Sequence, residues 1–139
     1  MTEITQLREG ESLTTLLAPV SRIDLIKYAG ASGDFNPIHT IDEEANKAGL
    51  PGIIAHGMWT MGNLSKLFTP YYEKGYIRDY AIRFAGMVFL NDVITLHADL
   101  VGRTENCLKF NVAAMNQHQK EVVKGKVEFA LYEPVEVKP

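Results

Sequence analysis

The 139-residue sequence contains only one cysteine, Cys107. A single cysteine cannot close an intramolecular disulfide or build a cysteine-based metal cage, and such scarcity is typical of proteins from a reducing compartment. Because it lies in a predicted strand, with no histidine or aspartate pattern around it, we interpret Cys107 as a small buried hydrophobe.

The sequence also lacks long apolar runs and an excess of basic charge. No apolar stretch approaches the roughly 20 residues of a membrane span, and residues 1–10 have no apolar core of the kind that marks a secretory signal. With 14 basic and 17 acidic residues, the net charge of −3 leaves no basic footprint for nucleic acid or an anionic membrane. We therefore expect a cytoplasmic protein that binds neither.

What the chain does contain is the composition of a folded domain. Hydrophobic residues make up 46% and charged residues 22% of the sequence, which excludes the disordered and fibrous classes. The length is close to that of one ordinary domain, and no internal repeat, low-complexity tract or Ser/Gly linker divides it. We therefore predict a single domain over residues 1–139.

Three helices are predicted before Pro70. The first begins at a Ser-x-x-Asp capping pattern, Ser21 with Asp24, and extends to about residue 29 or 31. The second begins at a Thr-x-x-Glu capping box, Thr40 with Glu43. The third is the most apolar; it runs from about residue 56 to just before Pro70, with apolar residues at spacings of three and four.

Strands are predicted in the opening segment and throughout the chain after Pro70. The segments with the composition of strands are 12–20, 79–90, 93–102, 106–115 and 121–132. Short turn sequences separate the last four, so antiparallel hairpins are expected. We predict an α+β hotdog fold, in which a curved antiparallel sheet wraps around one long apolar helix. Its exposed sheet edge predicts a dimer with a continuous sheet.

The densest group of reactive side chains lies in residues 28–39, which read Tyr-Ala-Gly-Ala-Ser-Gly-Asp-Phe-Asn-Pro-Ile-His. On a continuous helix, Asp34 and His39 would be about 140° apart and could not act together. Pro37 forbids such a helix and favours an extended conformation for Asn36. The chain must therefore turn between two helices, and the turn can bring Asp34 and His39 into one cleft.

The protonation state of His39 depends on two opposing effects. His39 directly precedes the predicted Thr40 cap, so the positive end of the second helix would disfavour its imidazolium form. An ionised Asp34 nearby would favour it.

A second element of chemical interest is Ala55-His56-Gly57-Met58, at the start of the third helix. The first amides of a helix have no intrahelical acceptor, and a glycine leaves its amide open to a ligand oxygen. The segment therefore has the makeup of an oxyanion hole, although a glycine near a helix start is also ordinary capping. We interpret His56 as a structural residue that is hydrogen-bonded at the helix start.

The run from residue 28 to 39, followed by Ala55-His56-Gly57-Met58, resembles the MaoC-like dehydratases, which include (R)-specific enoyl-CoA hydratases and 3-hydroxyacyl-ACP dehydratases. The Asp-x-Asn-Pro-x-His core of that family is matched without substitution. The resemblance implies that Asp34 and His39 are the catalytic acid/base pair. It also implies that Asn36 holds the motif loop and that the Gly57 amide receives the thioester carbonyl.

Further positions add to this resemblance or depart from it. Ser65 falls where some members of the family place a hydroxyl near the active site, and it can equally be a small packing residue. Met58 either packs in the core, as its helical spacing favours, or lines the acyl tunnel. Arg83-Phe84 matches the family's Arg-Phe strand, whereas Met87 and Asn91 replace the usual proline and glycine that follow.

The resemblance implies a lyase of fatty-acid metabolism that reversibly dehydrates (3R)-3-hydroxyacyl thioesters of CoA or ACP to trans-2-enoyl thioesters, with no metal or organic cofactor. A metal site at Asp34, His39 and His56 would be a different use of the same side chains, but no ligand spacing supports it. The competing hypotheses for function are a hotdog acyl-thioesterase and an acyl-thioester-binding subunit that is active only with a partner chain. We expect a homodimer or a higher homo-oligomer, with a heterodimer as the alternative.

Overall fold

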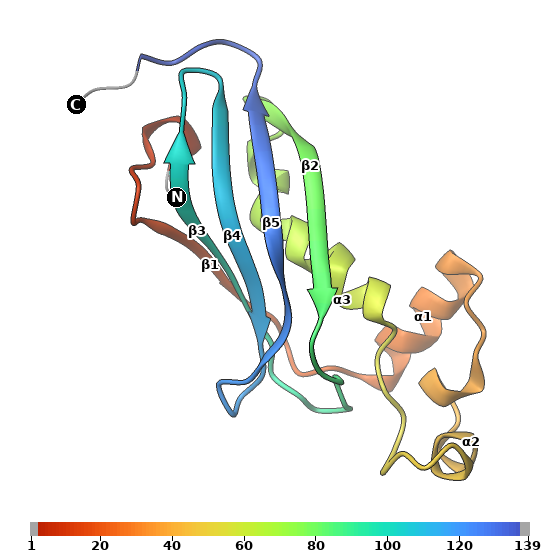
Figure 1. The fold of residues 1–139 in the computed structure, drawn as a ribbon. Helices are drawn as coiled ribbons and strands as arrows, with labels where there is room; N and C mark the ends of the chain where they lie inside the picture. Colours follow the sequence, from red (N-terminus) through yellow and green to blue (C-terminus); the bar gives the residue numbers. More distant parts are fainter. Residues whose placement is uncertain (1–2, 137–139) are drawn as a thin grey trace.

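The computed structural model describes residues 3–136; the predicted domain also includes residues 1–2 and 137–139, which lie outside this range. One antiparallel sheet has the strand order β1-β3-β4-β5-β2 (Figure 1). Its strands are β1 (Ser12–Leu16), β2 (Gly75–Phe84), β3 (Thr95–Arg103), β4 (Cys107–Met115) and β5 (Glu121–Leu131). The α-helices are α1 (Arg22–Ser32), α2 (Asp42–Lys47) and α3 (Gly57–Leu64). Short 3-10 turns span Ile4–Gln6, Pro37–His39, Ser65–Leu67 and Thr69–Tyr71.

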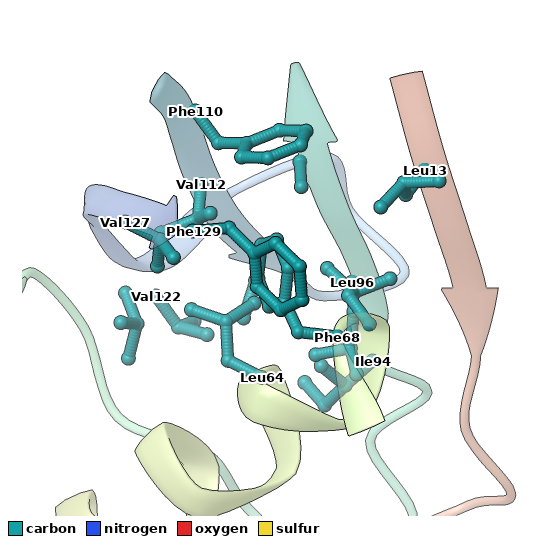
Figure 2. Packing of buried hydrophobic residues seen from close by; sticks show 14 of the residues in the cluster. Leu13, Leu64, Phe68, Ile94, Leu96, Phe110, Val112, Val122, Val127 and Phe129 are labelled. Atoms are coloured by element: carbon teal, nitrogen blue, oxygen red, sulfur yellow. The ribbon is translucent and has the colours of Figure 1, made fainter. Parts of the chain in front are cut away.

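The hydrophobic core lies between α3 and the face of the sheet that α3 crosses (Figure 1). Phe68, just beyond α3, packs edge-on against Phe110 of β4, with ring centroids 5.1 Å apart, and lies parallel to Phe129 of β5. Leu64 of α3 and Leu96 of β3 join the same cluster (Figure 2). A curved sheet packed around a central apolar helix is the hotdog fold, as predicted from the sequence.

The order of strands corrects one expected hairpin. The turns after β3 and β4 form antiparallel hairpins as predicted, but β2 pairs with β5 rather than with β3 and lies at the edge of the sheet. Asn91, with φ of 68°, does sit in a turn, and Asp92 accepts a hydrogen bond from the Phe89 amide. This turn belongs to the connection that crosses from β2 to β3, so a local turn signal alone did not identify the strand pairing.

The third helix is shorter than predicted. It ends at Leu64, where the Ser65 amide bonds to the Gly62 carbonyl and the chain tightens into 3-10 turns. The Met61 carbonyl instead accepts a hydrogen bond of 2.5 Å from the hydroxyl of Tyr80 on β2. Met58, in the first turn of α3, is 55% exposed, so its predicted place in the core is wrong.

The segment that carries α1 and α2 extends beyond the end of β2 (Figure 1). Ser21 caps α1 as predicted and accepts a hydrogen bond from the Asp24 amide. The predicted Thr40 capping box is wrong, because the amides of both Thr40 and Ile41 bond to the Pro37 carbonyl and Ile41 is the N-cap of α2. His39 therefore ends a 3-10 turn and lies two residues before Ile41, the N-cap of α2.

None of the helices within residues 3–136 has the length and apolar character needed to cross a lipid bilayer.

The start of α3 is fixed against β2 through Gly57. A Cβ atom added at Gly57 would lie 2.8 Å from Cε1 of the Phe84 ring, closer than van der Waals contact permits. Phe84 is half exposed, so a methyl group at residue 57 would displace the end of this ring. The glycine allows the Phe84 ring to lie directly on the start of α3.

We predict that Gly57→Ala and Phe84→Ala are coupled in stability. The methyl group should cost less when the Phe84 ring is absent, with a coupling free energy of about 1 kcal/mol in the double-mutant cycle. Urea unfolding of the wild type, the two single variants and the double variant measures it. Additive free energies of unfolding would show that the two residues do not constrain each other.

Candidate active site

The chain reverses direction between α1 and α2 through a series of capped turns. Gly33, with φ of 78°, ends α1 in the left-handed conformation that glycine adopts at little cost. The Asp34 carboxylate then accepts a hydrogen bond of 3.2 Å from the Asn36 amide. The Asn36 side chain accepts one of the same length from the Ile38 amide and caps the turn Pro37–His39. Asn36 thus holds the loop in shape, as its place in the motif suggested.

This reversal brings Asp34 and His39 together. His39 is buried, and its Nδ1 lies 2.8 Å from the Ile54 carbonyl oxygen. Because a carbonyl only accepts, Nδ1 carries the hydrogen and Nε2 of the neutral ring keeps a lone pair. This Nε2 lies 3.8 Å from Oδ2 of the half-exposed Asp34.

A distance of 3.8 Å exceeds that of a hydrogen bond. It does allow a single oxygen atom to lie within about 2.8 Å of both side chains. The pair, called the Asp34–His39 pair below, can therefore hold one water or hydroxyl group between an acid and a base.

His56 lies against both members of this pair. Its Nε2 is 3.1 Å from the Asp34 carbonyl oxygen, and its ring stacks on His39 with centroids 3.9 Å apart and planes at 27°. The pKa of His56 is lowered, mainly because burial disfavours the imidazolium and further because His39 is close; the Asp34 carbonyl and carboxylate act in the opposite direction. Sequence reasoning expected a hydrogen bond here but gave no sign of the stacking.

The same three side chains do not have the geometry of a metal site. One donor atom from each of Asp34, His39 and His56 lies within 4.8 Å of the other two. A zinc ion, however, needs imidazole lone pairs that converge at about 2.0–2.1 Å. The two rings are stacked, so their lone pairs lie in nearly parallel planes and do not converge on one ion. His39 Nδ1 and His56 Nε2 are also occupied by backbone carbonyls.

Gly57 opens α3 directly after His56, which is its N-cap. The amide of Gly57 is the first of the helix and has no intrahelical acceptor, and the residue is exposed. Because His56 stacks on His39, the head of α3 lies beside the Asp34–His39 pair. The arrangement offers a hydrogen-bond donor next to an acid and a base.

The two remaining predicted site residues, Met58 and Ser65, follow Gly57 in the sequence. Ser65 is the C-cap of α3, and its hydroxyl already donates a hydrogen bond of 2.6 Å to the Gly62 carbonyl. Met58 presents an exposed apolar side chain next to Gly57 in sequence.

An open depression of about 770 Å³ lies on the outer face of the sheet, lined in part by Arg83, Lys124 and Lys126, and none of the six predicted site residues lines it.

Comparison with known proteins identifies relatives over most of this chain. The fatty acid synthase beta subunit TOXC of Cochliobolus carbonum is 35% identical over 111 residues, which are 78% of this chain and 5% of that protein. The mitochondrial 3-hydroxyacyl-[acyl-carrier-protein] dehydratase of Arabidopsis thaliana is 27% identical over 104 residues, 72% of this chain and 63% of that protein. The chain thus spans about 5% of the length of the fatty acid synthase subunits it matches.

Among solved structures, the unliganded R-hydratase PhaJ1 from Pseudomonas aeruginosa superposes with a TM-score of 0.85 at 24% identity, over 96% of this chain and 90% of that one. This likeness establishes the fold. The family model described as the MaoC like domain matches residues 5–122, well over half of the sequence. The chain therefore belongs to the MaoC-like hydratase/dehydratase family.

Proposed function

We propose that this protein reversibly dehydrates (3R)-3-hydroxyacyl thioesters to trans-2-enoyl thioesters in fatty-acid metabolism. The observation that carries the proposal is the approach of Asp34 Oδ2 and His39 Nε2 to 3.8 Å, beside the first amide of α3. Membership of the MaoC-like family and the dehydratase named among the relatives support the same reaction class.

Dehydration requires one proton to be removed from C2 of the substrate and one to be donated to its hydroxyl group. Dehydration breaks the C2–H bond and the C3–O bond, and the hydroxyl group leaves as water after it gains a proton. Asp34 and His39 share these transfers, and each positioned proton transfer contributes roughly 10²–10⁴-fold to the rate. In the reverse direction the same pair holds and activates the incoming water.

Negative charge builds up on the thioester oxygen when the C2 proton is removed. We assign its stabilisation to the Gly57 amide, because a backbone donor that is already oriented needs no reorganisation during the reaction. No metal ion or organic cofactor is required, since a thioester carbonyl acidifies the C2 proton on its own.

Three further residues are proposed to position the substrate. Asn36 acts indirectly, through the turn that it caps. Met58 offers its exposed side chain to the acyl group. Ser65 can only accept a hydrogen bond from the substrate while its own hydrogen remains bonded to Gly62.

We predict that Asp34→Asn and His39→Gln each reduce hydration of crotonyl-CoA at least about 100-fold, because each removes one of the two proton-transfer groups. The decrease in enoyl absorbance measures the rate, and circular dichroism reports folding. The matched controls are Asp79→Asn, an exposed carboxylate on β2, and His118→Gln in the exposed turn after β4, both expected to retain the wild-type rate.

Wild-type activity in either site variant would contradict the assigned roles. Release of free CoA from acyl-CoA without hydration would instead indicate a hotdog thioesterase. A purified chain that binds acyl-CoA but turns over neither CoA nor ACP substrates would be a subunit that needs a different partner chain.

We also propose that a second chain pairs with the free edge of β2. This edge strand carries two exposed aromatic residues, Tyr76 at 47% and Phe84 at 52%, and an unpaired strand edge is a site for pairing with another chain. A second copy of the chain is the simplest partner, because closed homodimers are the commonest oligomers.

Sedimentation equilibrium should therefore give twice the mass of the chain. Tyr76→Lys is expected to weaken the dimer at least about tenfold, because it places a charge in an apolar contact. Val101→Lys, at an equally exposed position on β3, should leave the dimer intact. A monomer at micromolar concentration, or equal effects of the two lysines, would contradict pairing along β2.

A further inference from the structure

His56 is the only described side chain that both stacks on one member of the Asp34–His39 pair and hydrogen-bonds to the other, within residues 3–136. Its ring lies 3.9 Å from that of His39, and its Nε2 lies 3.1 Å from the Asp34 carbonyl oxygen. The residue is 2% exposed, and Tyr28 of α1 packs edge-on against it at 4.8 Å. One ring thus links α1, the Asp34 turn and the head of α3.

The hydrogen bond fixes the tautomer of His56. Because the Asp34 carbonyl can only accept, Nε2 carries the hydrogen and Nδ1 of the neutral ring carries the lone pair. Nδ1 is buried and has no hydrogen-bond partner within residues 3–136. Protonation would therefore create a buried N–H without an acceptor, which is unfavourable.

We propose that His56 is a positioning residue, whose neutral ring fixes both the Asp34 backbone and the plane of His39 in the arrangement that the reaction uses. This inference rests on the proposed function. His56 also directly precedes Gly57, so the same residue sets the position of the pair relative to the amide at the head of α3.

A neutral ring suits this place because His39 has to gain and lose a proton. A charged neighbour stacked on it would oppose each gain of a proton by electrostatic repulsion. The π face of a neutral ring tolerates or stabilises the transient positive charge. The titratable groups that face His56 are Tyr28, Asp34 and His39, and the lowered pKa of His56 agrees with a ring that stays neutral.

The first test uses the wild-type protein alone and needs no substrate. Imidazole ¹⁵N spectra, with His56 assigned by comparison with His56→Phe, should show the neutral Nε2–H tautomer of His56 at pH 7, with protonation only below pH 6.5, the ordinary value for histidine. A protonated His56 at pH 7, or the Nδ1–H tautomer, would overturn the proposal.

Stability gives a second measure of the same charge state. The unfolded chain binds a proton on His56 at a higher pH than the folded chain does, so this residue makes the wild type lose stability as the pH falls below about 6.5. The free energy of unfolding of the wild type should therefore decrease, relative to that of His56→Phe, as the pH is lowered from 7.5 to 5. A difference that does not change with pH would contradict a neutral buried His56.

The kinetic test separates the two contacts of the ring. His56→Phe keeps an aromatic ring without the donor, His56→Gln keeps an N–H donor without the ring, and His56→Leu keeps neither. We expect kcat to fall roughly 10- to 100-fold for His56→Phe and His56→Gln, and further for His56→Leu, as expected for a misplaced catalytic group. KM should stay within about threefold, and His118→Gln should retain the wild-type kcat.

These outcomes separate the inference from the proposed function. A wild type that does not hydrate enoyl thioesters, but has the neutral Nε2–H tautomer, would refute the proposed function and leave the structural role of His56 standing. An active wild type whose folded His56→Phe and His56→Leu variants retain kcat would refute the positioning role alone.

Discussion

The site depends on a reversal of the chain within the few residues that follow α1. Gly33 ends the helix in a left-handed conformation, Asn36 caps the next turn, and Pro37 prevents the helix from continuing. Only this reversal brings Asp34 Oδ2 and His39 Nε2 to 3.8 Å. Most residues of the turn before Ile38 are exposed, so its own hydrogen bonds and the ring of His56 hold the two side chains in place.

The rest of the fold fixes the partner of this turn, the head of α3. The later part of α3 and Phe68 are buried against β4 and β5, the Met61 carbonyl is bonded to Tyr80, and Phe84 lies on Gly57. The helix is therefore held by the sheet at several points along its length. A short, exposed turn and a firmly packed helix meet at His56, and the chemistry proposed for the protein requires both.

The features that the sequence predicted correctly depend on residues that lie close together in the chain. The Ser21 cap, the break at Pro37 and the two hairpins after β3 and β4 follow from residues within a few positions of each other. The Thr40 capping box failed because the turn at Pro37 takes the Thr40 and Ile41 amides and α2 begins one residue later, with Ile41 as its N-cap. The pairing of β2 with β5, the exposure of Met58 and the stacking of His56 on His39 depend on contacts between distant segments, and no spacing in the sequence encodes them. The motif predicted that Asp34 and His39 meet, but not which residue would hold them there.

The most direct test of this account is a crystal structure of the Asp34→Asn variant, which should turn over slowly, with crotonyl-CoA bound. The account predicts the thioester oxygen within about 3 Å of the Gly57 amide nitrogen, with the C2–C3 bond beside residue 34 and His39, and His56 still stacked on His39. An acyl group bound on the outer face of the sheet, or a thioester oxygen directed away from the head of α3, would contradict it.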